Sequence, residues 1–107
     1  MWRVEWHPRA VEELMRLPKD EQAAVDHAVE KLVTLGPRSP YPHQSAVQGE
    51  RGLRELRPRG GRSPWGALYK RRGSIFVLAA LAPEAEANSR GFGRAVRLAR
   101  RRLEGSR

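Results

Sequence analysis

The sequence predicts an α+β domain with the element order β-α-α-β-β-β-α and a small, mainly antiparallel sheet. Three observations favour this fold: an alternating N-terminal segment, two successive runs of helical periodicity, and three strand-like runs joined by short turns. Strands that follow one another through short turns pair antiparallel, and the helical hairpin is expected to cover one face of the sheet. The length of 107 residues fits a single domain over residues 1–107.

The N-terminal part is predicted to hold one strand and two helices. Residues 2–6 alternate between apolar and charged side chains, which is typical of a half-buried strand. Apolar residues then recur at helical spacing over residues 10–17 and again over 24–33. Pro18 separates the two runs and Gly36-Pro37 ends the second one. We therefore expect two helices that pack as an antiparallel pair.

The C-terminal part is predicted to hold three strands and an amphipathic helix. Residues 36–51 are rich in proline and are expected to form a long loop, which is often a functional feature in a small domain. Strands follow at 53–57, 65–71 and 75–82. The last strand is apolar on both faces, so we place it in the interior of the sheet. Apolar residues at helical spacing from Phe92 to Leu103 predict a C-terminal helix with arginines on its outer face.

Composition excludes several classes of protein. The chain has no cysteine, which excludes a disulfide scaffold, a thiolate metal site and a thiol nucleophile. The histidines lack metal-ligand spacing, so neither a metal nor another cofactor is expected. The longest uninterrupted apolar run, Ile75 to Ala82, is too short to span a bilayer, and the N-terminus lacks a signal-peptide run. We therefore expect a cytoplasmic protein without membrane association.

Positive charge is concentrated in the C-terminal part. The formal net charge is +9; residues 50–107 carry 15 basic and 5 acidic side chains, whereas residues 1–49 carry 6 and 7. Basic groups gathered on particular elements bind phosphates by releasing counterions, so a nucleic acid is the first candidate partner. The alternative is a solvated basic surface that reflects an arginine-rich composition.

Several strings of the sequence resemble the RelE/ParE superfamily of type II toxins, most closely its HigB-like, phage-associated branch. They are the strand and Pro-x-Ala-x-x-Glu-Leu stretch from Val4 to Leu14, the string Gly52-Leu53-Arg54-Glu55-Leu56-Arg57, the stretch from Trp65 to Tyr69 with its basic pair, and Phe76 to Ala82. The resemblance implies a small ribonuclease that cuts mRNA, usually on the ribosome. It also implies silencing by a cognate antitoxin, commonly one with a helix-turn-helix DNA-binding domain.

Two positions depart from the family pattern. Gly66 follows Trp65 where many RelE-like toxins have an arginine, and Ala82-Pro83-Glu84-Ala85-Glu86 is acidic where many HigB-like members have a lysine pair. Both departures remove positive charge. They favour an alternative hypothesis, a non-catalytic RNA- or protein-binding module on the toxin fold. A gyrase target of the ParE kind also stays open.

Cleavage of RNA by its own 2′-hydroxyl needs a base, an acid and cations that stabilise the phosphorane. We assign Arg54 and Arg57 as phosphate clamps, Glu55 as general base, Lys70 as proton donor or phosphate ligand, and His43 as acid or base. Strand alternation places the two arginines on opposite faces of the sheet. We therefore expect only one of them to contact the phosphate. Pairing with a neighbouring arginine is the alternative for the carboxylate.

The remaining candidates are expected to bind RNA around one concavity formed by the strands and the last helix. The aromatic residues Trp65 and Tyr69 would stack on bases, with core packing as the alternative. The cations would contact phosphates; they are Arg59, Arg62, Arg71, Arg94 and Arg97. A solvated face, or an antitoxin contact, is the alternative for the arginines of the last helix. His7 and His27 are expected to be structural or solvated.

Overall fold

The computed structural model describes residues 2–40 and 43–105 and contains one strand more than the sequence predicted. The strands are β1 (Arg3–Trp6), β2 (Gln44–Ala46), β3 (Leu53–Leu56), β4 (Trp65–Arg72) and β5 (Ile75–Pro83). The helices are α1 (Pro8–Met15), α2 (Lys19–Leu35) and α3 (Ser89–Gly105), with the 3₁₀ turns η1 (Gly36–Arg38) and η2 (Pro58–Gly61). Within the described ranges, no helix is both long enough and apolar enough to cross a membrane.

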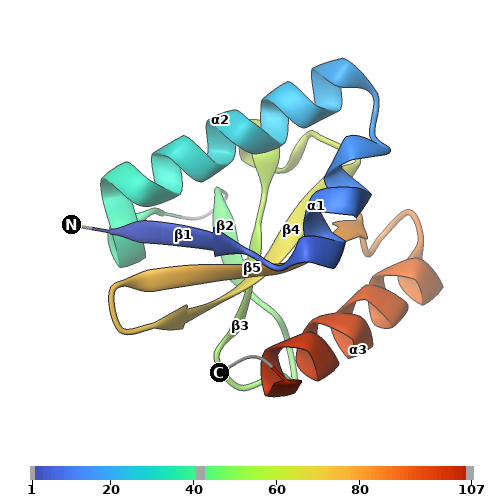
Figure 1. The fold of residues 1–107 in the computed structure, drawn as a ribbon. Coiled ribbons are helices and arrows are strands. Elements are labelled where there is room, and N and C mark those ends of the chain that lie inside the picture. Colours follow the sequence, from blue (N-terminus) through green and yellow to red (C-terminus); the bar gives the residue numbers. More distant parts are fainter. Residues whose placement is uncertain (1, 41–42, 106–107) are drawn as a thin grey trace.

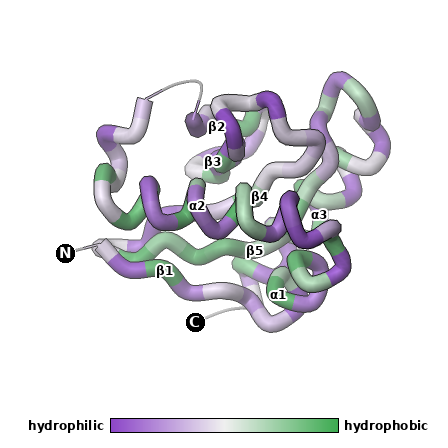
Figure 2. Tube along the Cα trace, turned by 90° about the horizontal axis from the view of Figure 1, so that it is seen from above, coloured by the Kyte–Doolittle hydropathy of each residue, from purple (hydrophilic) through white to green (hydrophobic). Residues whose placement is uncertain are grey.

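The strands form one mixed sheet in the order β1-β5-β4-β3-β2 (Figure 1). The predicted antiparallel meander of β3, β4 and β5 is confirmed, and so is the interior position of β5, which is buried on both faces. The hydropathy colours follow this burial, because β5 is hydrophobic along most of its length (Figure 2). β1 pairs with β5 in parallel, which the short-turn argument did not predict.

The predicted loop 36–51 is wrong in part, because it contains η1 and β2. β2 has only three residues, Gln-Ser-Ala, so its sequence shows no strand periodicity. Its pairing with β3 and the side chain of Gln44 hold it in place. The Gln44 amide donates to the backbone oxygen of Ser39 and its oxygen accepts from Arg54 Nε. Tyr41 and Pro42 lie outside the described residues.

The helices cover the sheet on both faces (Figure 1). α1 and α2 lie on one face, and α3 packs against β5 and β4 on the other. The predicted pair of helices on one face of the sheet is confirmed, and the two helices share one core cluster. α1 lies over β5, and α2 lies over β4, β1 and the two 3₁₀ turns, since both helices turn their apolar stripes toward the strands.

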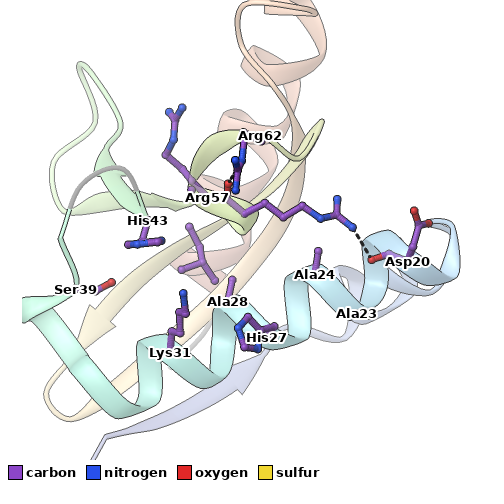
Figure 3. Close-up of a pocket in the computed structure, with 13 residues that line it drawn as sticks. Asp20, Ala23, Ala24, His27, Ala28, Lys31, Ser39, His43, Arg57 and Arg62 are labelled. Atoms are coloured by element: carbon purple, nitrogen blue, oxygen red, sulfur yellow. Dashed lines mark hydrogen bonds between the residues drawn. The ribbon is translucent and has the colours of Figure 1, made fainter.

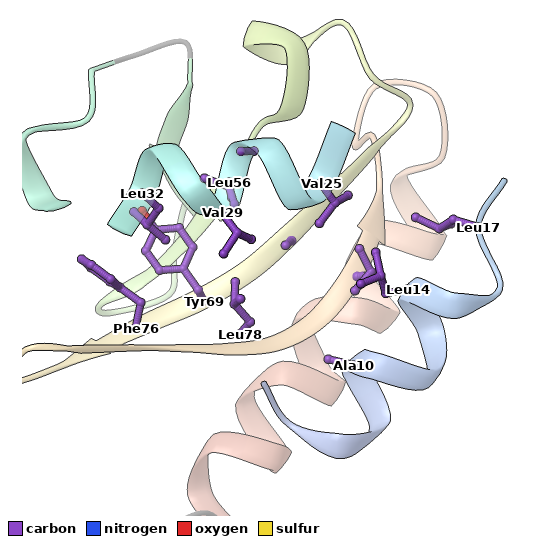
Figure 4. Packing of buried hydrophobic residues seen from close by; sticks show 13 residues of the cluster. Ala10, Leu14, Leu17, Val25, Val29, Leu32, Leu56, Tyr69, Phe76 and Leu78 are labelled. Atoms are coloured by element: carbon purple, nitrogen blue, oxygen red, sulfur yellow. The ribbon is translucent and has the colours of Figure 1, made fainter. Parts of the chain in front are cut away.

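Tyr69 belongs to the core beneath α2 (Figure 4). It is 2% exposed, its ring meets Phe76 edge-on with the centroids 5.7 Å apart, and its hydroxyl donates to Gln44 Oε1 over 3.3 Å. Burial raises the pKa of this phenol, while the neighbouring Arg54 opposes the shift. Stacking on an RNA base is therefore not open to Tyr69, and the alternative of core packing describes it.

Two charged side chains cover the edge of β5 beyond the end of β1. β1 pairs with β5 only as far as Leu78, so the following backbone groups have no neighbouring strand on that side. Glu13 of α1 accepts from the Leu81 N–H over 3.0 Å, and Arg102 of α3 donates to the Ala79 carbonyl over 2.8 Å. The two side chains also pair with each other at 2.8 Å. We call this arrangement the Glu13–Arg102 clasp; it joins both ends of the chain to the sheet.

Candidate functional site

A cleft of about 540 Å³ lies between α2 and the segment that runs from the end of β3 through η2 (Figure 3). We call it the basic cleft. α2 contributes Asp20, Ala23, Ala24, His27, Ala28 and Lys31; the other walls are Ser39, His43, Leu56, Arg57, Arg59, Gly60 and Arg62. One carboxylate thus faces four cationic side chains and two imidazoles above a floor of alanines. Such a surface attracts phosphate groups.

The basic cleft brings together four of the residues selected from the sequence: His43, Arg57, Arg59 and Arg62. His27, which was expected to be structural or solvated, lines the same cleft. Its position four residues before Lys31 places both side chains on one face of α2, and this spacing was the available signal.

Arg59 lines the cleft and reaches across to the start of α2. Its guanidinium donates to Glu21 Oε2 over 2.8 Å and to the Asp20 carbonyl over 3.2 Å. Hydrogen bonds from Ser63 and then from Arg59 lower the pKa of Glu21. The Arg59 backbone has φ of 55°, a left-handed conformation that few non-glycine residues adopt. Arg59 therefore holds η2 against α2 in addition to adding charge.

A smaller hollow of about 80 Å³ adjoins the basic cleft, and Arg57 lines both. We call it the Glu55 hollow; its other walls are Gly61, Ser63, Trp65, Gly66, Glu84, Ala85 and Glu86. Arg57 Nη1 lies 3.7 Å from Glu55 Oε1, so the predicted alternative of an ion pair is present. Burial nonetheless raises the pKa of Glu55; Arg57 opposes this shift and Glu84 adds to it.

Gly66 leaves space for the Glu55 carboxylate. A Cβ at position 66 would lie 2.8 Å from the Leu56 carbonyl oxygen and 3.0 Å from Glu55 Oε2. No side chain fits at this position without moving the backbone of β3. The glycine at position 66 therefore has a local steric reason, because the Leu56 carbonyl and the Glu55 carboxylate occupy the space that a side chain would need.

The raised pKa of Glu55 predicts a pH-dependent cost to stability. At pH values below 4.5, the usual pKa of a glutamate side chain, Glu55 is protonated in both the folded and the unfolded state. As pH rises from there through the higher folded pKa, the unfolded state ionises first, so the free energy of unfolding decreases. Glu55→Gln should remove this decrease in urea titrations at a series of pH values. Glu12→Gln, at an exposed position on α1, is the control, and an unchanged pH slope in Glu55→Gln would contradict the assignment.

The other predicted cations do not share the cleft, so the expectation of one concavity is wrong. Arg54 points toward Gln44 and Tyr69 and lines neither hollow, which agrees with the predicted divergence from Arg57. Lys70 lines a separate hollow of about 350 Å³ beside the C-terminal end of α3. The cause is the two-sided sheet, which separates side chains that lie close in sequence.

Three more predicted arginines also lie away from the cleft. The guanidinium of Arg71 lies 4.7 Å from the ring centroid of Trp2. Arg94 and Arg97 are exposed on α3, on the opposite face of the sheet from α2. Trp65 is partly buried, and its ring lines the Glu55 hollow. In residues 2–40 and 43–105, no three His, Asp or Glu side chains gather as metal ligands would.

Three solved structures with a similar fold contain proteins named RelE. A mutant of the E. coli toxin RelE in the free state superimposes with a TM-score of 0.65 at 15% identity, over 90% of this chain and 95% of that one. The archaeal RelE–RelB complex from Pyrococcus horikoshii OT3 gives 0.56 at 22% identity, over 78% and 94%. The isolated E. coli RelE toxin gives 0.57 at 14% identity, over 91% and 97%. These likenesses establish a RelE-like fold.

Sequence comparison identifies the family. A search among curated proteins finds no match. The family model described as phage-derived protein Gp49-like (DUF891) matches residues 12–82, which include the Gly52–Arg57 string and strands β2 to β4 together with most of β5. The chain therefore belongs to the Gp49-like phage-derived family, a RelE/HigB-type toxin family with a RelE-like fold.

Proposed function

We propose that the protein is the toxin of a type II toxin–antitoxin system and cleaves mRNA on the ribosome, in the cytoplasm. The family and the fold support the toxin assignment. The observation that carries the proposed chemistry is the position of Arg57, which lies between the basic cleft and the Glu55 hollow. A phosphate held by Arg57 would have cations on one side and a carboxylate of raised pKa on the other.

The proposed reaction uses the 2′-hydroxyl of the RNA as nucleophile. Glu55 takes the proton of this hydroxyl, the oxygen attacks the adjacent phosphorus, and the bond to the 5′-oxygen breaks. His43 returns a proton to that oxygen. Arg57 and Arg62 stabilise the charge that develops on the phosphorane, which is usually the largest contribution to such catalysis. Trp65 stacks on a neighbouring base. The products are a 2′,3′-cyclic phosphate and a free 5′-hydroxyl.

A cognate antitoxin is the proposed partner. One of the similar structures is a RelE–RelB complex, and the family resemblance favours an antitoxin with a helix-turn-helix domain. Such a protein would silence the toxin until it is degraded.

Purified ribosomes programmed with a defined mRNA test the proposal. We expect cleavage at specific positions that depends on the ribosome, and end-group analysis should find the cyclic phosphate. A parallel supercoiling assay with gyrase tests the ParE-like target. Salt-sensitive RNA binding without cleavage would instead support the non-catalytic module that Gly66 and the acidic stretch favour.

A further inference from the structure

Trp65 lines a further hollow with an apolar floor in addition to the Glu55 hollow. This groove has a volume of about 380 Å³ and runs between the end of α1 and the first turns of α3. Its floor and sides are formed by Leu17, Trp65, Leu81, Pro83, Gly91, Ala95 and Leu98, and its polar rim by Glu13, Arg16, Asn88 and Arg94. We call it the α1–α3 groove.

The rim of the groove carries positive charge that is not neutralised. Arg16 and Arg94 form no ion pair among the residues that the structure describes. Glu13, the one carboxylate among the lining residues, is already bound to Arg102 and to the Leu81 N–H in the clasp. The groove therefore offers apolar contact below and two available guanidinium groups above, which suits an apolar segment with acidic flanks.

The length of the groove sets the size of the partner. The lining residues of α3 run from Gly91 to Leu98, which corresponds to about 11 Å of helix. A partner helix of at least two turns would match this length. α1 also exposes two of its apolar side chains, Val11 and Met15, at 39% and 60%. Because they lie one turn apart, they extend the apolar character of α1 beyond the groove.

We propose that the α1–α3 groove binds a short amphipathic helix of a second protein, with an apolar stripe that faces Leu81 and Leu98 and with carboxylates that pair with Arg16 and Arg94. Trp65 forms part of the wall of both the groove and the Glu55 hollow. A helix bound in the groove would contact the Trp65 indole and restrict its motion. Binding in the groove would therefore affect the Glu55 hollow without filling the basic cleft.

The probe is a fluorescein-labelled synthetic helix of about 14 residues, with leucines at i, i+3, i+4 and i+7 and glutamates at the other positions. Fluorescence anisotropy with the full chain should show saturable one-to-one binding. A peptide with lysine in place of glutamate should bind about tenfold more weakly or worse. Arg94→Glu should weaken binding of the acidic peptide by about tenfold. Arg97→Glu changes the net charge equally on the same helix but lies outside the groove, and it should have little effect.

Three results would overturn this proposal. The first is absence of saturation up to about 1 mM peptide. The second is equal weakening by Arg94→Glu and Arg97→Glu, which would mean that the peptide responds only to overall charge. The third is a dimer of the protein, seen by sedimentation, that Arg94→Glu disrupts, because a second copy would then occupy the groove. Failure of mRNA cleavage on ribosomes would leave the groove proposal intact, since no step of it depends on cleavage.

Discussion

Replacing Arg57 with alanine is expected to lower ribosome-dependent RNA cleavage by about 10²- to 10³-fold. The guanidinium lines both hollows and lies 3.7 Å from the carboxylate proposed as general base. Its loss removes a cation from the phosphorane and also frees Glu55 from a partner that opposes the rise in its pKa. The pH optimum of the remaining activity should therefore move upward. Single-turnover cleavage over a series of pH values measures both effects.

Arg9→Ala provides the matched control, because it removes one positive charge from an exposed site on α1. It should leave cleavage nearly unchanged. Arg57→Lys separates charge from geometry, since lysine keeps the charge but not the two-pronged contact with phosphate. Equal activity of Arg57→Ala and Arg9→Ala would show that Arg57 takes no part in cleavage. That result would contradict the proposed chemistry.

The variant Arg102→Ala is expected to lose about 2–4 kcal/mol of unfolding free energy. Arg102 is 13% exposed and joins α3 to the Ala79 carbonyl and to Glu13. Its removal leaves a carbonyl on the β5 edge unsatisfied and the Glu13 carboxylate unpaired in a half-buried position. Urea denaturation monitored by tryptophan fluorescence measures this loss.

The neighbouring Arg101→Ala changes the same helix at an exposed position and should fall within about 0.5 kcal/mol of the parent protein. A double-mutant cycle with Glu13→Gln gives the coupling energy between the two side chains. A coupling near zero would show that the clasp is incidental to stability.

The fold was largely predictable because its strands and helices carry strong periodicity. The apolar run of β5 and the helical spacing of α3 specify buried surfaces that only a sheet with helices on both faces can satisfy. β2 was missed because tertiary pairing, through Gln44 and β3, forms it without any local pattern. The parallel pairing of β1 likewise depends on the return path of the chain and not on the sequence of β1 itself.

The candidate site was predictable only in part. The sequence shows which residue types are present, but it does not show on which face of the sheet or helix each side chain lies. His43, Arg57, Arg59 and Arg62 come together through the loops that flank β3. Arg54 is separated from them by strand alternation, an outcome that the same alternation had predicted. His27 was not selected, because its four-residue spacing from Lys31 on α2 becomes informative only once the opposite wall of the cleft is known.

The Glu13–Arg102 clasp has a consequence for synthesis of the chain. Glu13 and Arg102 are 89 residues apart in the chain, and β1 must also wait for β5 before it can pair. Contacts this distant in sequence are slow to form. During synthesis, the sheet therefore cannot close at this edge while the segment that carries Arg102 is still inside the exit tunnel.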